Sequence, residues 1–282
     1  MRYLIAGRNG QLAKEFIRTF ERTGAPYLAP DEADLDITDL GRIDACVASF
    51  KPDVVINCAA YNLVDKAEQD PNKAFLVNAT GPQLLARAAG KHAARILHFS
   101  SDYVFDGQKE NGLYGEGDAP APLNEYGRSK LEGERLVQSE TDRHLILRLS
   151  WVYGEGTHNF LVKLADWAKG SEYLKIACDE FSVPTSTRTI VDVALRALDQ
   201  DVTGLWHATN SGYCSRYEWA QLALSVLGVR KFIRPVSMDS FNLPAKRPKF
   251  SAMSNEAVSR RLGMEIPSWS EAVTAFLRER NR

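Results

Sequence analysis

Short apolar runs alternate with stretches of helical periodicity along the first half of the chain. The apolar runs have the length of buried strands and lie at Tyr3–Ala6, Tyr27–Ala29, Asp53–Ile56, Ile96–Ser100 and His144–Leu149. Between them, apolar residues recur every three or four positions over about Gln11–Arg22, Leu40–Phe50, Lys73–Lys91 and Asn124–Ser139. Short strands separated by helices predict a parallel sheet that is covered on both faces. We therefore expect an α/β fold of Rossmann type with a doubly wound parallel sheet.

The pattern changes after Trp151. Tryptophans and prolines become more frequent, and Pro235–Pro248 shows little periodicity. We predict a dinucleotide-binding domain over residues 1–150 and a smaller, mainly substrate-binding domain over residues 151–282. Three later patterns predict that the chain returns to the first domain near residues 173–207: Leu174–Ala177, Thr189–Leu198 and Leu205–Ala208.

Composition narrows the class of protein. The 282 residues carry 35 Lys+Arg against 36 Asp+Glu, a formal net charge of −1, which argues against a nucleic-acid partner. No apolar run approaches the ~20 residues of a membrane span, and the N-terminus does not resemble a signal peptide. Four cysteines without a CxxC pair suit a reducing compartment. We expect a cytoplasmic protein with no membrane partner.

A glycine turn, Gly7-Arg8-Asn9-Gly10-Gln11-Leu12-Ala13, follows the first predicted strand and opens a helix. Glycines let the backbone approach a pyrophosphate, and the helix N-terminus supplies free N–H groups. Two glycines also occur in ordinary strand–helix turns, so the position at the start of the alternating pattern carries the inference. We predict a dinucleotide site at Gly7, Asn9, Gly10, Gln11 and Leu12.

The choice between NADH and NADPH stays open. Asp36 could hydrogen-bond to the adenine side of the cofactor, although Thr38 or Asp39 could equally cap the next helix. Asp31 suits a ribose 2′-hydroxyl, whereas Arg8 suits a 2′-phosphate.

Tyr126 and Lys130 form the second motif. Residues four apart share one helical face, with Cβ atoms about 5–6 Å apart. A nearby ammonium lowers a tyrosine pKa from its usual ~10, and the tyrosine can then donate a proton near neutral pH. Ser101 ends the fourth predicted strand, where a doubly wound sheet binds its ligand; its simpler interpretation is a turn residue. Together the three supply a hydroxyl, an acid and a cation around one carbonyl.

These residues resemble the extended short-chain dehydrogenase/reductases, and longer motifs resemble the dTDP-4-dehydrorhamnose reductase family. The longer motifs are Val55–Tyr61 (VINCAAY), Val64–Glu68 (VDKAE), Phe99–Gly107 (FSSDYVFDG), Leu149–Gly154 (LSWVYG) and Ala245–Ser251 (AKRPKFS). The resemblance spans nearly the whole chain and is far more specific than a Tyr–Lys pair.

The resemblance implies a role for each matching position. Tyr126 would protonate the C4 oxygen of a keto sugar, Lys130 would bind the nicotinamide ribose and lower the Tyr126 pKa, and Ser101 would bind the same oxygen. The implied cofactor contacts are Gly10, Gln11 and Leu12 at the diphosphate, Asp36 and Ile37 at the adenine, and Ala59, Ala60, Tyr61 and Asn78 along the cofactor. The expected substrate contacts are Asp102, Tyr103 and Trp151, with Arg216 and Arg247 at the diphosphate or, equally, as solvated surface residues.

Some positions depart from the family pattern. Ala13 replaces a commoner glycine, Ser101 stands where threonine is frequent, and Ser182 replaces a usual glycine, which changes the expected shape of that loop. Some family members are metal-bridged dimers, and Glu15 matches one acidic ligand. No other ligand is recognisable, and the five histidines show no HxxxH or HExxH spacing, so we predict no metal. A homodimer is compatible with the sequence.

The resemblance implies NAD(P)H-dependent reduction of dTDP-4-dehydro-L-rhamnose. A reductase or epimerase of another nucleotide sugar is one alternative. A second is a non-catalytic, dinucleotide-binding regulatory subunit of the methionine adenosyltransferase type. A 4,6-dehydratase is disfavoured because Tyr103 stands where a second acid would follow Asp102.

Overall fold

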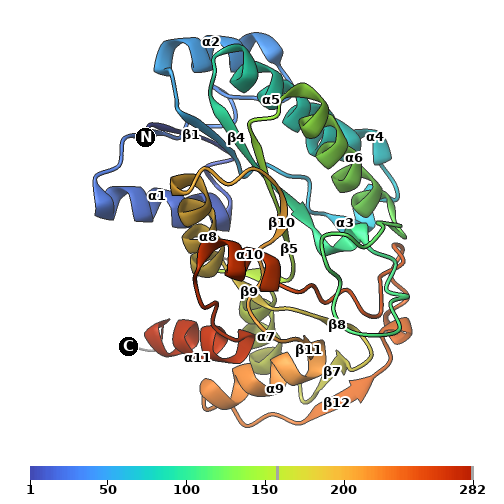
Figure 1. The fold of residues 1–282 in the computed structure, drawn as a ribbon. Helices are drawn as coiled ribbons and strands as arrows, with labels where there is room; N and C mark the ends of the chain where they lie inside the picture. The colour runs from blue at the N-terminus through green and yellow to red at the C-terminus, as the bar shows by residue number, and fades with distance from the viewer. Residues whose placement is uncertain (157–158, 281–282) are drawn as a thin grey trace.

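A six-stranded parallel sheet forms the centre of the molecule (Figure 1). The computed structural model describes residues 1–156 and 159–280. In spatial order the strands are β10 (Gly204–His207), β5 (His144–Leu149), β4 (Arg95–Ser101), β3 (Val54–Asn57), β1 (Tyr3–Ala6) and β2 (Tyr27–Leu28). All neighbours pair in parallel. The predicted fold class is confirmed. The strand order reverses between β1 and β3, which places the ligand crevice at their carboxyl ends.

The strands read as continuous apolar runs because both faces of the sheet are covered. In β1, Tyr3 and Ile5 belong to one core and Leu4 and Ala6 to the other, as the twofold alternation of a strand requires. In Figure 1 one face is covered by α1 (Gln11–Thr23) and α8 (Thr187–Asp199). The other carries α2 (Leu40–Phe50), α5 (Gly81–Lys91) and α6 (Glu125–Glu140).

The connection between β3 and β4 is more complex than one helix. After the short helices α3 (Val64–Ala67) and α4 (Pro71–Phe75), a π-helical turn, η1 (Leu76–Thr80), precedes α5. The sequence predicted a single helix over Lys73–Lys91, because side-chain periodicity does not reveal one widened turn. Such turns are frequent at functional sites.

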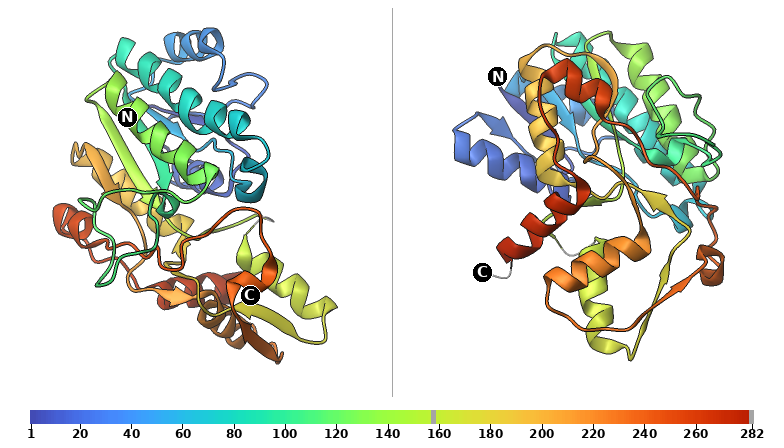
Figure 2. Two further views of the ribbon diagram at one scale, coloured as in Figure 1. Left: turned by 90° about the vertical axis from the view of Figure 1, so that its right-hand side faces the viewer. Right: turned by 60° about the horizontal axis from the view of Figure 1, so that its bottom comes forward.

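A second group of elements packs around its own core below the sheet in both views of Figure 2. Its centre is the buried Trp219, and the Tyr153 ring contacts both Trp219 and Phe276. Its helices are α7 (Phe160–Gly170), α9 (Arg216–Val226) and α11 (Trp269–Arg280). Its paired strands are β7 (Leu174–Ala177) with β12 (Ile233–Val236), β8 (Phe181–Ser182) with β11 (Cys214–Ser215), and β6 (Val152–Tyr153) with β9 (Thr185–Ser186).

The chain returns from this group to the main sheet twice. α8 packs on α1, and β10 joins β5 at the sheet edge. After the short helix η3 (Met238–Phe241), α10 (Glu256–Leu262) packs on α8 and β10, a second return that the sequence did not predict. Leu174–Ala177, which we expected in the main sheet, pairs with β12 instead. None of the described helices combines the length and the apolar character needed to cross a membrane.

Candidate active site

A cavity of about 320 Å³ lies at the carboxyl ends of the central strands. It is the crevice expected from the strand order. Its walls come from the start of α1 (Gly10, Gln11, Leu12), the end of β3 (Asn57, Cys58, Ala59, Ala60, Asn62), the end of β4 (Phe99, Ser100, Ser101, Asp102), α6 (Tyr126, Lys130) and the end of β5 (Leu149, Ser150, Trp151, Val152).

The glycine turn fits a dinucleotide diphosphate. Gly7 has φ +81°, and a Cβ at this position would lie 2.5 Å from the backbone nitrogen of Ala59, so only glycine is tolerated. Gly10 is the N-cap of α1 and has no side chain that could accept from the first N–H groups of the helix. The first N–H groups of the helix therefore remain available to an anion at the cavity wall.

Asn78 ties the cofactor loop to the catalytic helix. From the π-helical turn, its side chain accepts a hydrogen bond from the Tyr61 backbone nitrogen (2.8 Å) and donates to the Ser129 hydroxyl (3.0 Å). Ser129 in turn donates to the backbone oxygen of Tyr126 (2.8 Å). Asn78 is fully buried, and Asn62, one residue after Tyr61, lines the cavity instead of Tyr61. Asn78 thus supports the site from behind.

Ser101, Tyr126 and Lys130 all reach this cavity. The Asn124 side chain caps α6 by accepting from the Gly127 backbone nitrogen (2.7 Å), which sets the start of the helix that carries Tyr126 and Lys130. Lys130 is buried, and its Nζ donates to the backbone oxygen of Phe99 (2.5 Å).

Burial dominates the electrostatics of Tyr126 and Lys130. Burial raises the pKa of Tyr126 to about 12, with the Ser101 hydroxyl opposing this shift. Burial lowers the pKa of Lys130 to about 8, with Glu134 opposing it. The Lys130 ammonium group is bound to the Phe99 carbonyl, and burial is the largest influence on the Tyr126 pKa. Tyr126 is therefore protonated at neutral pH, as a proton donor must be.

Asp102 is an ionisable group in the cavity wall with only 2% of its surface exposed. Burial raises its pKa to about 6, while hydrogen bonds from Ser251, Ser182 and Ser101 oppose the shift. Tyr103 follows it and packs edge-on against the Tyr126 ring, with 5.7 Å between ring centroids. Tyr103 is buried behind the cavity rather than part of its lining.

A second cavity, of about 530 Å³, adjoins the first and shares Trp151 and Val152 with it. Its other lining residues are mainly aromatic, apolar or basic: Asn159, Phe160, Lys163, Trp167, Lys175, Ile176, Ala177, Glu180, Arg216, Trp219, Met238, Phe241, Leu243 and Arg247. The Arg216 guanidinium carbon lies 3.7 Å from the centroid of the Trp151 ring, and its Nε donates to Glu180 (3.1 Å). Arg247 is held by Asp65 (2.7 and 3.0 Å).

Trp151 stands at the junction of the two cavities in a strained conformation. Its φ is +38°, a backbone angle that residues with a Cβ rarely adopt. Such backbone strain is concentrated at functional sites. Within residues 1–156 and 159–280, its buried indole N–H has no hydrogen-bond partner.

Comparison with known proteins agrees with this geometry. A family model described as "RmlD substrate binding domain" matches residues 1–282. The chain belongs to the dTDP-4-dehydrorhamnose reductase family. A dTDP-4-dehydrorhamnose reductase from Burkholderia thailandensis is 36% identical, with 99% of each chain covered. A structure from Clostridium acetobutylicum with this name matches with a TM-score of 0.96 at 34% identity, covering 100% of each chain. A dTDP-4-dehydrorhamnose reductase structure from Bacillus anthracis, in complex with NADP, matches with a TM-score of 0.94 at 32% identity and covers 99% of each chain.

Two residues expected at the adenine lie outside both cavities of this reductase-family chain. The Asp36 carboxylate accepts from the Thr38 backbone nitrogen (2.8 Å) and hydroxyl (2.7 Å), which lowers the Asp36 pKa. Ile37 is buried beneath Gly81. The Asp39 side chain caps α2 by accepting from the Arg42 backbone nitrogen, as the capping interpretation of this segment predicted.

The two residues that gave conflicting cofactor signals pair with each other. The Arg8 Nη1 and Asp31 Oδ2 atoms lie 3.6 Å apart, and both side chains are exposed. Asn9, next to Arg8 in the glycine turn, is exposed as well.

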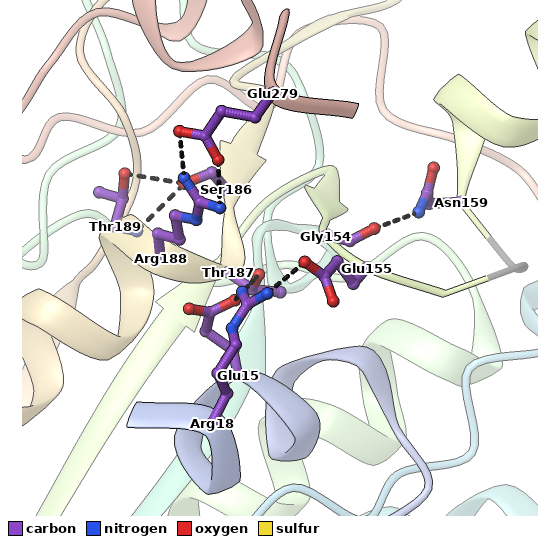
Figure 3. A network of polar contacts seen from close by, with 10 residues as sticks. All are labelled: Glu15, Arg18, Gly154, Glu155, Asn159, Ser186, Thr187, Arg188, Thr189 and Glu279. Carbon is purple, nitrogen blue, oxygen red and sulfur yellow. Dashed lines mark hydrogen bonds and ion pairs between the residues drawn. The ribbon is translucent and has the colours of Figure 1, made fainter. Parts of the chain in front are cut away.

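Glu15 lies among basic, hydroxyl and acidic side chains, and Glu155 is close to it (Figure 3). It is buried, pairs with Arg18 and accepts from the Thr187 hydroxyl (3.3 Å); Arg18 also pairs with Glu155. Arg188 pairs with Glu279 (2.6 Å) beside it. No cluster of three His, Cys, Asp or Glu side chains is found in the described residues, and His158 lies outside them.

Sequence reasoning missed much of the second cavity. Phe160, Lys163 and Trp167 lie three and four residues apart on α7, and this spacing on one helical face was the available signal. For Asn62, the only signal in the sequence was its position directly after Tyr61.

Proposed function

We propose that this chain uses NADPH or NADH to reduce the C4 keto group of dTDP-4-dehydro-L-rhamnose, giving dTDP-L-rhamnose. One observation carries the proposal: Ser101, Tyr126 and Lys130 share a single cavity with the glycine turn at the start of α1. The cavity thus combines a proton donor with a dinucleotide cradle. Membership of the dTDP-4-dehydrorhamnose reductase family supports the substrate.

We call the first cavity, at the carboxyl ends of the central strands, the sheet-end cavity, and each of its reacting residues has a separate role. The chemistry supplied by bound reduced nicotinamide is transfer of a hydride to C4. Tyr126 donates its phenolic proton to the C4 oxygen, which becomes a hydroxyl. Ser101 donates a hydrogen bond to that oxygen and stabilises the charge that develops on it. The Lys130 ammonium stabilises the phenolate left on Tyr126 before it is reprotonated.

The second cavity suits the nucleotide of the substrate. Arg216, Lys163 and Lys175 supply positive charge for a diphosphate, and Trp167 offers a half-exposed indole on which a base can stack. Trp151 would contact the sugar where the two cavities meet. We propose that the region 151–282, apart from its returns to the sheet, binds substrate while residues 1–150 bind the cofactor.

We also propose a cytoplasmic enzyme, in keeping with four free cysteines. Whether it acts as a monomer or a homodimer is a separate question, which sedimentation equilibrium of the purified protein answers.

The deciding experiment follows the loss of reduced-nicotinamide absorbance with dTDP-4-dehydro-6-deoxyglucose, with and without the 3,5-epimerase that produces the rhamnose precursor. NADH and NADPH are compared in parallel. We expect turnover only with the epimerase, and its loss in Tyr126→Phe. The product should co-migrate with dTDP-L-rhamnose.

Two other outcomes point to the alternatives. Epimerase-independent turnover, or turnover with another nucleotide-linked keto sugar, would indicate a different reductase or epimerase. Tight dinucleotide binding without turnover of any keto sugar would favour the regulatory-subunit hypothesis, which co-purification with a catalytic subunit would then test.

A further inference from the structure

Three serine hydroxyls from distant parts of the chain converge on the Asp102 carboxylate. Ser182 and Ser251 donate to Oδ2 at 2.8 and 2.6 Å, and Ser101 donates to Oδ1 at 3.1 Å. All four side chains are at least nine-tenths buried. Since a carboxylate oxygen has two lone pairs, Ser182 and Ser251 saturate Oδ2 and leave Ser101 alone on Oδ1.

The two donors to Oδ2 are held in place by the backbone. The Phe181 nitrogen donates to the Lys249 oxygen (2.7 Å), and the Ser251 nitrogen donates to the Phe181 oxygen (2.9 Å). β8 also pairs with β11 through Ser182 and Cys214. Ser182 and Ser251 therefore lie close together on two segments that are hydrogen-bonded to each other through the backbone. These backbone bonds fix where each serine lies.

The Ser101 hydroxyl both accepts and donates a hydrogen bond. Its oxygen accepts from the Tyr103 backbone nitrogen (3.2 Å), and its proton points to Asp102. To bind a keto oxygen, Ser101 must turn this proton away from Asp102. Its bond to the carboxylate is the longest of the three and exceeds the ~2.5–2.7 Å of a strong hydroxyl–carboxylate bond, so it is the one most easily released.

We propose that Ser182 and Ser251 are positioning residues which satisfy and orient the Asp102 carboxylate, so that the Ser101 hydroxyl is free to bind the keto oxygen of the substrate. The inference rests on the proposed reductase function. Without either donor, Asp102 would hold the Ser101 proton more tightly, because a buried carboxylate that loses one hydrogen bond strengthens the others. Removing one donor should thus impair a step that depends on Ser101, although neither serine lines the cavity.

The test is a double-mutant cycle on kcat at saturating substrate and cofactor. We expect Ser182→Ala and Ser251→Ala each to lower kcat about tenfold while the Kd for NADPH changes less than twofold. In a Ser101→Ala background, the same changes should lower kcat less than twofold, because the group through which they act is gone. A merely structural role would give the same factor in both backgrounds.

Ser259→Ala is the matched control. Ser259 lies on α10, outside the lining of both cavities, and its hydroxyl donates to the Met264 backbone oxygen (2.6 Å), so kcat should not change. Thermal unfolding of each variant checks that it is folded, and Ser182→Gly replaces Ser182→Ala if the latter is not. Wild-type kcat in both Ser182→Ala and Ser251→Ala, or equal losses in the two backgrounds, would overturn the inference. An inactive wild-type enzyme would instead overturn the proposed function.

Discussion

The two adjoining cavities of this molecule are built in different ways. The sheet-end cavity takes all its lining from residues 10–152, mostly from backbone and short side chains where parallel strands end. The second cavity takes its lining from residues 151–247, mostly from long aromatic and basic side chains on helices and connecting segments. Strand ends hold reacting groups rigidly, whereas long side chains on separate elements offer area and charge for recognition.

This contrast separates the expected effects of mutations. Changes in the sheet-end cavity should reduce the rate of the chemical step, and changes in the second should weaken binding of the nucleotide sugar. Trp151 lines both cavities, and Arg216 stacks on it, so these two residues connect the two cavities.

The largest effect is expected for Tyr126→Phe. The change removes the proton donor and keeps the ring that packs against Tyr103, so kcat should fall about 10³-fold. The Kd for NADPH, measured by fluorescence titration, should stay within about threefold. Retention of more than a tenth of wild-type kcat would show that another group donates the proton.

The pH profile of kcat/KM tests the electrostatics of the same cavity. Lys130, with a pKa of about 8, is cationic below that pH and loses its charge above it. Asp102, with a pKa of about 6, is ionised above that pH and takes up a proton below it. Between these two values Asp102 is ionised and Lys130 is charged, and activity should fall up to about tenfold per pH unit above about pH 8, where Lys130 loses its charge. A profile that stays flat to pH 9.5 would contradict the assignment to Lys130.

Arg216→Ala should act on the second cavity. Loss of its charge and of its stacking on Trp151 should raise KM for the nucleotide sugar about tenfold and leave the Kd for NADPH unchanged. Arg216→Lys keeps the charge without the planar fork and should be intermediate. An equal effect of Arg216→Ala on cofactor binding would show that the two cavities are not separable as described.

The smallest effect is expected at the exposed Arg8–Asp31 pair. Arg8→Ala should raise KM for NADPH about threefold relative to KM for NADH, because an exposed arginine contributes modestly to binding a 2′-phosphate. Asp31→Ala should shift the preference the other way. If neither change alters the ratio, cofactor choice is made elsewhere.

Local sequence patterns were sufficient to predict the sheet and the reacting groups. Buried parallel strands appear as short apolar runs, a strand–turn–helix with glycines has a fixed backbone geometry, and Tyr126 and Lys130 share a helical face through local spacing alone. Because parallel strands end at one edge of the sheet, Ser101 could be placed beside them before the structure was known. The π-helical turn escaped prediction because it leaves side-chain periodicity almost intact.

The contacts between distant segments could not be predicted from local patterns. Ser182 and Ser251 meet Asp102 across 80 and 149 residues of chain, and Arg247 meets Asp65 across 182. The sheet that Leu174–Ala177 joins was likewise settled by packing. Local sequence patterns report the conformation of neighbouring residues, but they contain no signal for which buried hydroxyl, carboxylate or strand edge a segment will meet after folding.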